Sequence, residues 1–209
     1  MESSSISHLY LVRHGVTAWN QEKKYMGHSD LPILKDGLRD YGPLKEFFKL
    51  YPPDLVYASD LRRCRQTAAY LFPGAEVSTD PRLRELFFGT FEGKTYEQLK
   101  DLDSYRDWLQ NWPDAAPDQG EESKAFSSRI TLFKEQVLDA RFQTSGGRCV
   151  VVTHGGVIRE LLTLYQPELT YWDIPTPFGN AYHLILNAKG GGVQCKSLSV
   201  VPIQASGVL

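Results

Sequence analysis

The chain has 209 residues, of which 42% are hydrophobic, and carries a formal net charge of −2 at neutral pH. This length suits a single domain, residues 1–209, and the near-neutral charge gives no reason to expect nucleic acid or a membrane as a partner. Because the N-terminus does not resemble a signal peptide and no stretch approaches about 18 apolar residues, we expect a soluble cytoplasmic protein. The oligomeric state stays open, with a homodimer as one option.

The three cysteines, Cys64, Cys149 and Cys195, are widely separated and lack the spacing of metal ligands. We expect them to be small, buried or half-buried thiols in a reducing compartment. The sequence also lacks an obvious carboxylate cluster for a divalent ion. No metal and no cofactor are therefore expected.

The run from Leu9 to Val12 is apolar and too short for a helix, and Gly15 stops it. It predicts a buried strand with Arg13 and His14 side by side at its carboxyl end. Ligands of open α/β sheets bind at this end of the strands, so the position favours chemistry over packing. The alternative for a single histidine is a surface or a hydrogen-bonded core residue.

The same design recurs where the apolar run from Cys149 to Val152 leads to His154, Gly155 and a helix-forming segment. If the two strands are parallel neighbours, both imidazoles open into one crevice. Glycine lets the backbone turn sharply, and the N–H groups at a helix N-terminus favour an anion. The repeated pattern therefore predicts an anion-binding site.

Helical and strand periodicities alternate between these two histidines. Thr17 is a good N-cap for a short helix, and Pro52 and Pro53 end a longer one. The expected elements are a short helix from residue 18, a loop over 23–36, helices over 37–50 and 61–72, and strands over 54–59 and 75–79.

The second long helix, which Ser59 or Asp60 caps, carries Arg62, Arg63 and Arg65 in its first turn. A helix N-terminus disfavours cations, so this placement indicates an anion nearby. The alternative for each arginine is a solvated surface charge.

Glu85 lies in an apolar stretch between Leu83 and Phe88. Such a setting draws a carboxyl partly out of water and favours the protonated form, which can donate a proton. The alternative is a salt bridge with Arg82 or Arg84.

Residues 95–125 change character, because they hold many aromatic side chains at helical spacing and a loop rich in proline and aspartate. We interpret residues 93–125 as a small helical cap inserted over the site, where substrate choice would be made. The aromatic residues are more typical of a core than of a substrate pocket. The remaining expected elements are a long helix over 123–142, a helix ending at residue 165, strands over 182–186 and 193–201, and a disordered tail over 206–209.

Together these motifs resemble the histidine phosphatase superfamily, also called phosphoglycerate mutase-like. The resemblance covers residues 9 to about 186 and implies an α/β fold: a three-layer sandwich with a mostly parallel central sheet flanked by helices, and a small helical cap over the site. It is carried by Arg13-His14-Gly15, Asn20, the segments 59–67 and 83–85, and Thr153-His154-Gly155.

The resemblance implies a phosphate site built from Arg13, Asn20, Arg63, His154 and Gly155. A phosphate monoester carries nearly two negative charges near neutral pH. The forked guanidinium groups match its oxygens in a geometry that lysine cannot provide. The implied partner is a small-molecule phosphate ester.

The implied chemistry begins with a neutral His14 that attacks phosphorus and forms a phosphohistidine. The carbonyl of Gly15 is a candidate to orient its ring. Glu85 would protonate the leaving alkoxide and then activate water, and a protonated His154 would stabilise the equatorial oxygens. No step needs a metal ion.

Within the family, Leu86 to Gly89, the short aromatic cap and Gly120-Glu121 are most similar to alpha-ribazole phosphatases of cobalamin assembly. A broad-specificity or phosphosugar phosphatase would have nearly the same cap. The runner-up, a phosphoglycerate mutase, would have a longer segment after the acid region and a longer tail. A third alternative is a catalytically weak phospho-ligand sensor.

Three positions depart from the family pattern. Val16 replaces an acidic residue, Met26 stands where some members place a phosphate-contacting glutamine, and Asp40-Tyr41 stands where the family often has Gln-Ala. These departures concern substrate handling more than the reaction.

Overall fold

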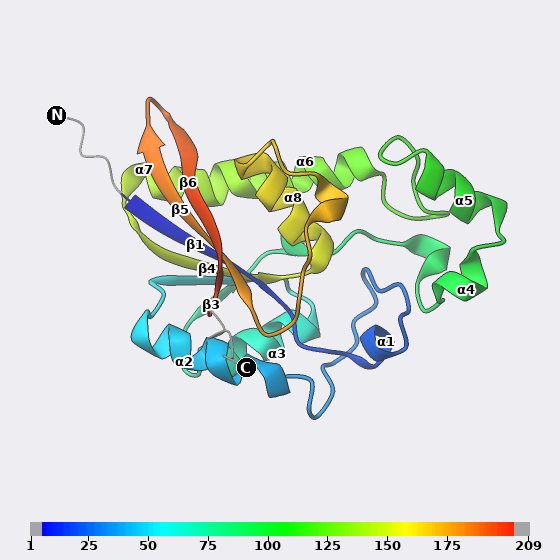
Figure 1. Cartoon of the computed structure of the whole chain (residues 1–209), viewed down its shortest axis with the longest axis horizontal. Helices are drawn as coiled ribbons and strands as arrows, with labels where there is room; N and C mark the ends of the chain where they lie inside the picture. Colours follow the sequence, from blue (N-terminus) through cyan, green and yellow to red (C-terminus); the bar gives the residue numbers. More distant parts are fainter. Residues whose placement is uncertain (1–5, 203–209) are drawn as a thin grey trace, which may run out of the picture.

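The computed structural model describes residues 6–202 and shows a six-stranded sheet with helices on both faces (Figure 1). The first four strands of the chain are parallel, and β5 is antiparallel to both of its neighbours. The expected α/β sandwich with a mostly parallel sheet is confirmed. In spatial order the strands are β3 (Val77–Thr79), β2 (Leu55–Ala58), β4 (Gly147–Thr153), β1 (Ile6–Arg13), β5 (Ala181–Lys189) and β6 (Gly192–Val201).

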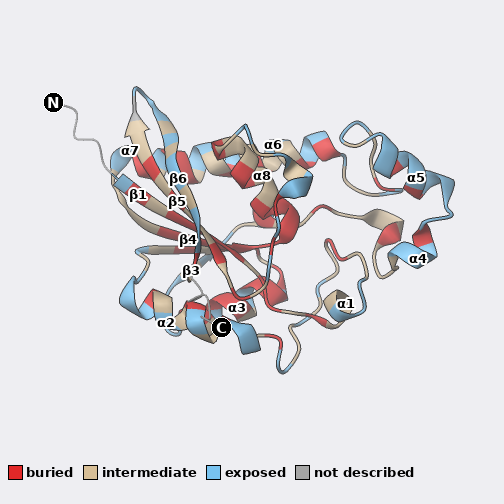
Figure 2. Ribbon diagram, in the orientation of Figure 1, coloured by how far each residue is buried: buried red, intermediate tan, exposed pale blue. Residues whose placement is uncertain are grey.

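Both faces of the central strands are buried, which explains their continuous apolar runs (Figure 2). Leu9 and Leu11 of β1 pack into one core cluster, while Tyr10 and Val12 point the other way into a second cluster. The first cluster is covered by α6 (Ser123–Phe133), α7 (Ala140–Thr144) and α8 (Gly155–Tyr165), and the second by α2 (Gly42–Leu50) and α3 (Arg62–Leu71).

The pairing of β1 with β4 places the two strand-end histidines side by side. Arg13 lies opposite Thr153 in a parallel register, and the His14 N–H donates to the Thr153 carbonyl at 2.9 Å. His154 follows directly and is the N-cap of α8. The prediction that the two strands are parallel neighbours is therefore confirmed.

Several element boundaries differ from the predicted ones for local reasons. The helix expected over 37–50 is split, because Gly42 and Pro43 begin a new α-helix after a 3₁₀ turn. The expected cap of α3 by Ser59 or Asp60 is wrong, since Leu61 is the N-cap and makes no side-chain capping bond. The long helix over 123–142 is present, with a π-helical stretch at Lys134–Asp139 between α6 and α7.

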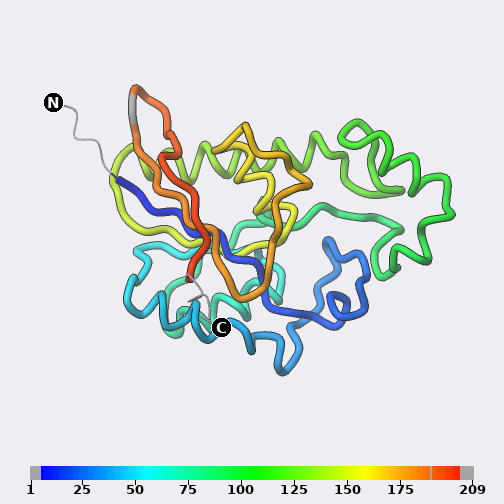
Figure 3. Tube along the Cα trace, in the orientation of Figure 1, coloured from blue at the N-terminus to red at the C-terminus, as the bar shows by residue number. Residues whose placement is uncertain are grey.

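Two short helices lie away from the sheet in the region predicted to be a cap (Figure 1). The chain that follows α1 runs beside the chain that leads into α4 (Figure 3), and Lys24 pairs with Thr95 in an isolated antiparallel bridge. Tyr105 and Trp108 of this region are buried, which confirms a core role for part of its aromatic set. The short elements are α1 (Ala18–Gln21), α4 (Tyr96–Leu99), α5 (Asp103–Gln110), and 3₁₀ turns at Arg39–Tyr41, Pro81–Leu83, Gly89–Phe91 and Tyr171–Asp173.

Within residues 6–202, no helix has the length and apolar character needed to cross a bilayer. The tail expected to be disordered, 206–209, lies outside the described residues.

Candidate active site

His14 is buried at the carboxyl end of β1, with 3% of its surface exposed. Its Nδ1 donates to the carbonyl of Gly15 at 2.7 Å, as expected, which leaves the lone pair on Nε2. Burial, followed by the charges of Arg63 and Arg13, lowers the pKa of His14 well below its usual value. The ring is therefore a neutral imidazole whose Nε2 carries the lone pair.

Two hydroxyl groups hold the backbone around His14. The Tyr41 hydroxyl contacts the carbonyl oxygens of Arg13 and His14 at 2.8 and 2.9 Å, and its side chain is completely buried. The Thr67 hydroxyl of α3 accepts the Gly15 N–H at 2.8 Å. In the sequence Tyr41 was an apolar position of the helix expected over 37–50 and a departure from the family pattern, and the structure gives it this supporting contact.

His154 faces His14, with ring centroids 5.1 Å apart. Its Nδ1 accepts from Nε of Arg63 at 3.3 Å, and its Nε2 lies 3.0 Å from the Ser59 hydroxyl. Burial, followed by the charge of Arg63, lowers the pKa of His154 well below its usual value. In this structure His154 is therefore a neutral imidazole that accepts from Arg63, and the stabilising role expected for it depended on protonation beside a phosphate.

Arg63 is fully buried in the first turn of α3, whereas Arg62 and Arg65 are exposed, as expected. Its Nη1 donates to the Ser29 carbonyl at 2.8 Å and its Nη2 to the Gly27 carbonyl at 2.7 Å. Each Nη keeps a second N–H, because a guanidinium has five N–H donors. Arg63 thus joins the loop at Gly27 and Ser29 to His154.

Arg13 lies at the end of β1, beside Thr176 and the start of α8. Its Nη1 donates to the Thr176 carbonyl at 2.8 Å, and its guanidinium lies 4.1 Å from the centre of the Phe178 ring. Its Nε is buried and has no hydrogen-bond partner among the described residues. A Cβ on Gly155 would lie 3.9 Å from the Arg13 guanidinium carbon, so the start of α8 is adjacent to this unpaired donor.

Glu85 is half-buried at the N-terminus of α8. Its Oε2 accepts the Gly156 N–H at 2.9 Å, and its Oε1 accepts the Leu86 N–H at 3.0 Å. A Cβ on Gly156 would stand 2.2 Å from Oε1, so only glycine allows this approach. The carboxyl group therefore occupies part of the helix N-terminus that the sequence assigned to an anion.

The alternative interpretation of Glu85 as a salt-bridge partner is wrong. Arg82 pairs with Asp80 at 2.7 Å, and Arg84 pairs with Asp60 at 2.5 Å. Both arginines form ion pairs with carboxylates that precede them in the chain. The Glu85 side chain instead accepts hydrogen bonds from backbone amides.

Asn20 has a clear local contact. Its Oδ1 accepts the N–H and the hydroxyl of Thr17, both at 3.0 Å, in a capping box at the start of α1. The same hydroxyl lies 3.4 Å from the sulfur of Met26. The structure thus ties the loop after His14 together through residues that sequence reasoning had linked only to phosphate handling.

A pocket of about 180 Å³ opens beside Glu85. One wall comes from the region predicted to be a cap, and the other from α8 and the turn at Tyr171–Asp173. Tyr171 and Trp172 gave no signal in the sequence, because they lie in a loop distant from both histidines. The lining residues are Tyr25, Glu85, Leu86, Phe88, Trp108, Leu109, Trp112, Gly156, Arg159, Tyr171 and Trp172.

No three His, Cys, Asp or Glu side chains of the described chain are grouped as ligands for a metal ion. All three cysteines are free thiols. Cys64 lies 3.5 Å from His154 Nε2, and burial raises its pKa to about 12, so its sulfur is a poor nucleophile.

Residues 9–201 match the model of the histidine phosphatase superfamily, branch 1. The adenosylcobalamin/alpha-ribazole phosphatase of Salmonella typhimurium is 33% identical over 78% of this chain and 83% of its own length. The phosphoglycerate mutase-like protein 4 of Arabidopsis thaliana is also 33% identical, over 80% of this chain and 74% of its own. The crystal structure of the alpha-ribazole phosphatase from Shigella flexneri superposes with a TM-score of 0.80 at 26% identity, covering 91% of this chain and 95% of the other. With this sheet order, these paired histidines and these relatives, the chain belongs to the histidine phosphatase superfamily.

Proposed function

We propose that this protein is a metal-independent phosphomonoesterase that works through a phosphohistidine on His14. The observation that supports it best is a buried, neutral imidazole whose Nδ1 is held by the Gly15 carbonyl. Its Nε2 attacks phosphorus in line, so a P–N bond forms as the P–O bond to the leaving group breaks. Arg13 and Arg63 offset the charge of the phosphate that would otherwise repel the nucleophile.

Glu85 and His154 complete the proposed cycle. Protonated Glu85 gives its proton to the leaving alkoxide, and as a carboxylate it then takes a proton from the water that attacks the phosphohistidine. The dianionic phosphate raises the proton affinity of His154, which then stabilises the equatorial oxygens. Asn20 lies in α1, in the segment that follows His14, and Gly155 begins α8, and we assign both residues to phosphate binding.

The proposed substrate is a small phosphate ester whose leaving group carries a planar, apolar ring. The pocket beside Glu85 supports this choice, because aromatic side chains dominate its lining and it has room for a small ring system. The relatives from Salmonella typhimurium and Shigella flexneri are named for alpha-ribazole, so alpha-ribazole 5′-phosphate is the first compound to test. In this proposal residues 93–125 act as a cap, and the three free thiols fit a cytoplasmic location.

The test is a steady-state assay of the purified protein in the presence of a chelator. The substrates are alpha-ribazole 5′-phosphate, phosphosugars, 3-phosphoglycerate and an aryl phosphate, and both inorganic phosphate and isomerised product are followed. We expect phosphate release without isomerisation. We also expect His14→Ala to lower kcat by at least about 10³-fold while the fold is kept.

Other outcomes would replace the proposal. Isomer formation without phosphate release would show a mutase, and silence on all substrates would favour a phospho-ligand sensor. Hydrolysis that survives His14→Ala would remove the phosphohistidine mechanism.

A further inference from the structure

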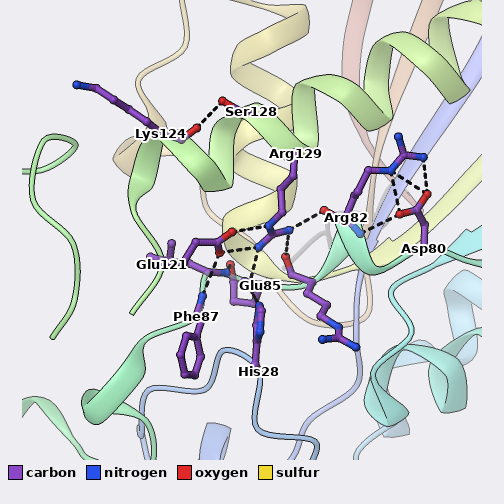
Figure 4. A network of polar contacts seen from close by, with 11 residues as sticks. His28, Asp80, Arg82, Glu85, Phe87, Glu121, Lys124, Ser128 and Arg129 are labelled. Atoms are coloured by element: carbon purple, nitrogen blue, oxygen red, sulfur yellow. Dashed lines mark hydrogen bonds and ion pairs between the residues drawn. The ribbon is translucent and has the colours of Figure 1, made fainter. Parts of the chain in front are cut away.

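Arg129 of α6 forms hydrogen bonds with the backbone of the segment that carries Glu85 (Figure 4). Nη1 of Arg129 donates to the carbonyl oxygens of Arg82 and Arg84, both at 2.6 Å, and Nη2 donates to the carbonyl of Glu85 at 2.9 Å. The three acceptors belong to the chain that leads into the proposed acid. A single guanidinium therefore sets the path of this backbone.

Glu121 completes the contacts of Arg129. Its two carboxylate oxygens accept from Nε at 2.7 Å and from Nη2 at 2.9 Å. All five N–H donors of the guanidinium thus have acceptors. The pair is well shielded from water, with side chains 18% and 16% exposed, so salt screens it weakly.

Glu121 also ties the segment to the end of the proposed cap. Its backbone N–H donates to the Phe87 carbonyl at 2.9 Å, and its carboxylate accepts the Phe87 N–H at 3.3 Å. On the opposite side, Nε2 of His28 lies 3.0 Å from the Glu85 carbonyl. The backbone on both sides of the Glu85 side chain is therefore anchored, and the carboxyl group is held against α8.

We propose that Arg129, paired with Glu121, is a positioning residue for the reaction. Its side chain does not line the pocket and reaches Glu85 only through the main-chain carbonyl, so it acts by holding the main chain so that the Glu85 carboxyl lies at the N-terminus of α8. An acid displaced by about 1 Å can lose on the order of 100-fold in rate, so such support has kinetic consequences. The inference rests on the proposed function, because it assigns Glu85 the proton transfer.

The first test compares an alkyl with an aryl phosphate, since only the poor alkoxide leaving group needs a proton donor. We expect Arg129→Ala to lower kcat about 30- to 100-fold for the alkyl ester and less than about threefold for the aryl ester, with KM nearly unchanged. Arg129→Lys keeps the charge but lacks the fork, so it restores only part of the loss. In a Glu85→Gln background, Arg129→Ala should add little further loss, because the group that it positions is already gone.

The matched control is Lys134→Ala on the same long helix. Lys134 pairs with Asp139 at 2.6 Å, with side chains 14% and 12% exposed, and within residues 6–202 no hydrogen bond or ion pair joins its side chain to the Glu85 segment. The Lys134→Ala variant is expected to lower the free energy of unfolding and to leave the ratio of kcat for the alkyl ester to kcat for the aryl ester unchanged. Equal losses of Arg129→Ala on both esters, or a full additional loss in the Glu85→Gln background, would overturn the proposal.

A second measurement does not depend on activity. The amide protons of Leu86 and Gly156 are held by the Glu85 carboxylate, so their hydrogen exchange should be faster in Arg129→Lys and unchanged in Lys134→Ala. Unchanged exchange in Arg129→Lys would reject the positioning role. This variant also serves if Arg129→Ala fails to fold. A wild type without His14-dependent hydrolysis would reject the proposed function, and the exchange experiment would still decide the role of Arg129.

Discussion

His14 combines burial, a fixed tautomer and two nearby guanidinium groups. Burial and the two positive charges keep the ring neutral, because a charged imidazole would lose hydration and face both guanidinium groups, and they outweigh the Gly15 hydrogen bond, which raises the pKa. Glu85 differs in that its contacts are backbone amides, one of them at the start of a helix. The proposed nucleophile and the proposed proton donor thus have distinct surroundings.

The role of Glu85 can be tested by Glu85→Gln, which keeps the shape and removes the transferable proton. We expect kcat to fall on the order of 10²- to 10⁴-fold for an alkyl phosphate and much less for an aryl phosphate, whose leaving group needs no proton. Initial rates on matched pairs of alkyl and aryl esters give the loss of kcat for each ester, and the ratio of the two losses is compared. Equal losses on both esters would count against a general acid at this position.

The sheet carries a second pair of histidines, on neighbouring strands and outside the candidate site. His8 of β1 and His183 of β5 are joined by a 2.9 Å contact between Nδ1 and Nε2, and their rings stack. Burial, followed by the proximity of His8, lowers the pKa of His183 to about 4. Burial, followed by the charge of Arg148, lowers the pKa of His8. One proton between the two nitrogens suits this contact, and a second would make one ring a cation and set two N–H donors against each other.

This pair predicts acid-sensitive stability. Both pKa values are lower in the folded state than in the unfolded chain, whose histidines titrate near ~6.5, so the unfolded state binds more protons in acid. The stability contribution is intact above that pH and is lost as the pH falls toward about 4. Urea unfolding at pH 7.5 and 4.5 measures the loss.

The control for this pair is His183→Phe, which keeps the ring stacked on Tyr10 and removes one titrating group. We expect its unfolding free energy to fall less between the two pH values. His14 and His154 act in the same direction, so some loss remains. An identical pH dependence in wild type and variant would show that the pair is not responsible.

At the scale of the whole molecule, the pocket beside Glu85 exists only because distant segments meet. Trp108 and Trp112 come from the proposed cap, whereas Tyr171 and Trp172 follow α8. The edge of Trp112 meets the ring of Trp172, with centroids 5.5 Å apart. The pocket therefore changes if either segment moves.

Trp172→Ala tests the contribution of this pocket to substrate choice. Losing a large aromatic surface costs about 1.5–3 kcal/mol of binding, which corresponds to roughly a 10- to 100-fold higher KM for a ring-bearing ester. Glycerol phosphate, which has no ring, should be unaffected. Tyr96→Ala is the control, because Tyr96 and Trp172 are both 54% exposed but Tyr96 does not line the pocket. Similar effects of both variants would argue against a ring-binding role.

Local patterns predicted much of the site. The apolar runs before His14 and His154, each followed by glycine, indicated two strand ends, and the structure places them in parallel register. The alternative considered for Glu85, a salt bridge with a neighbouring arginine, was wrong, although those arginines were the nearest charges in the sequence. Those arginines have carboxylates of their own, and the start of α8 supplies the amide that Glu85 uses.

By itself, the sequence determined the α/β class, the two strand-end histidines and the family, since strand length, periodicity and turn residues act over a few positions. The tertiary structure alone decided the contacts that connect distant residues. Thr67 reaches the Gly15 amide across 52 positions, and Arg129 reaches the Glu85 carbonyl across 44. Many residues could serve as donors to a given carbonyl, and only the packing of α3 and α6 against the sheet selects these two, because a hydrogen bond requires atoms within about 3 Å.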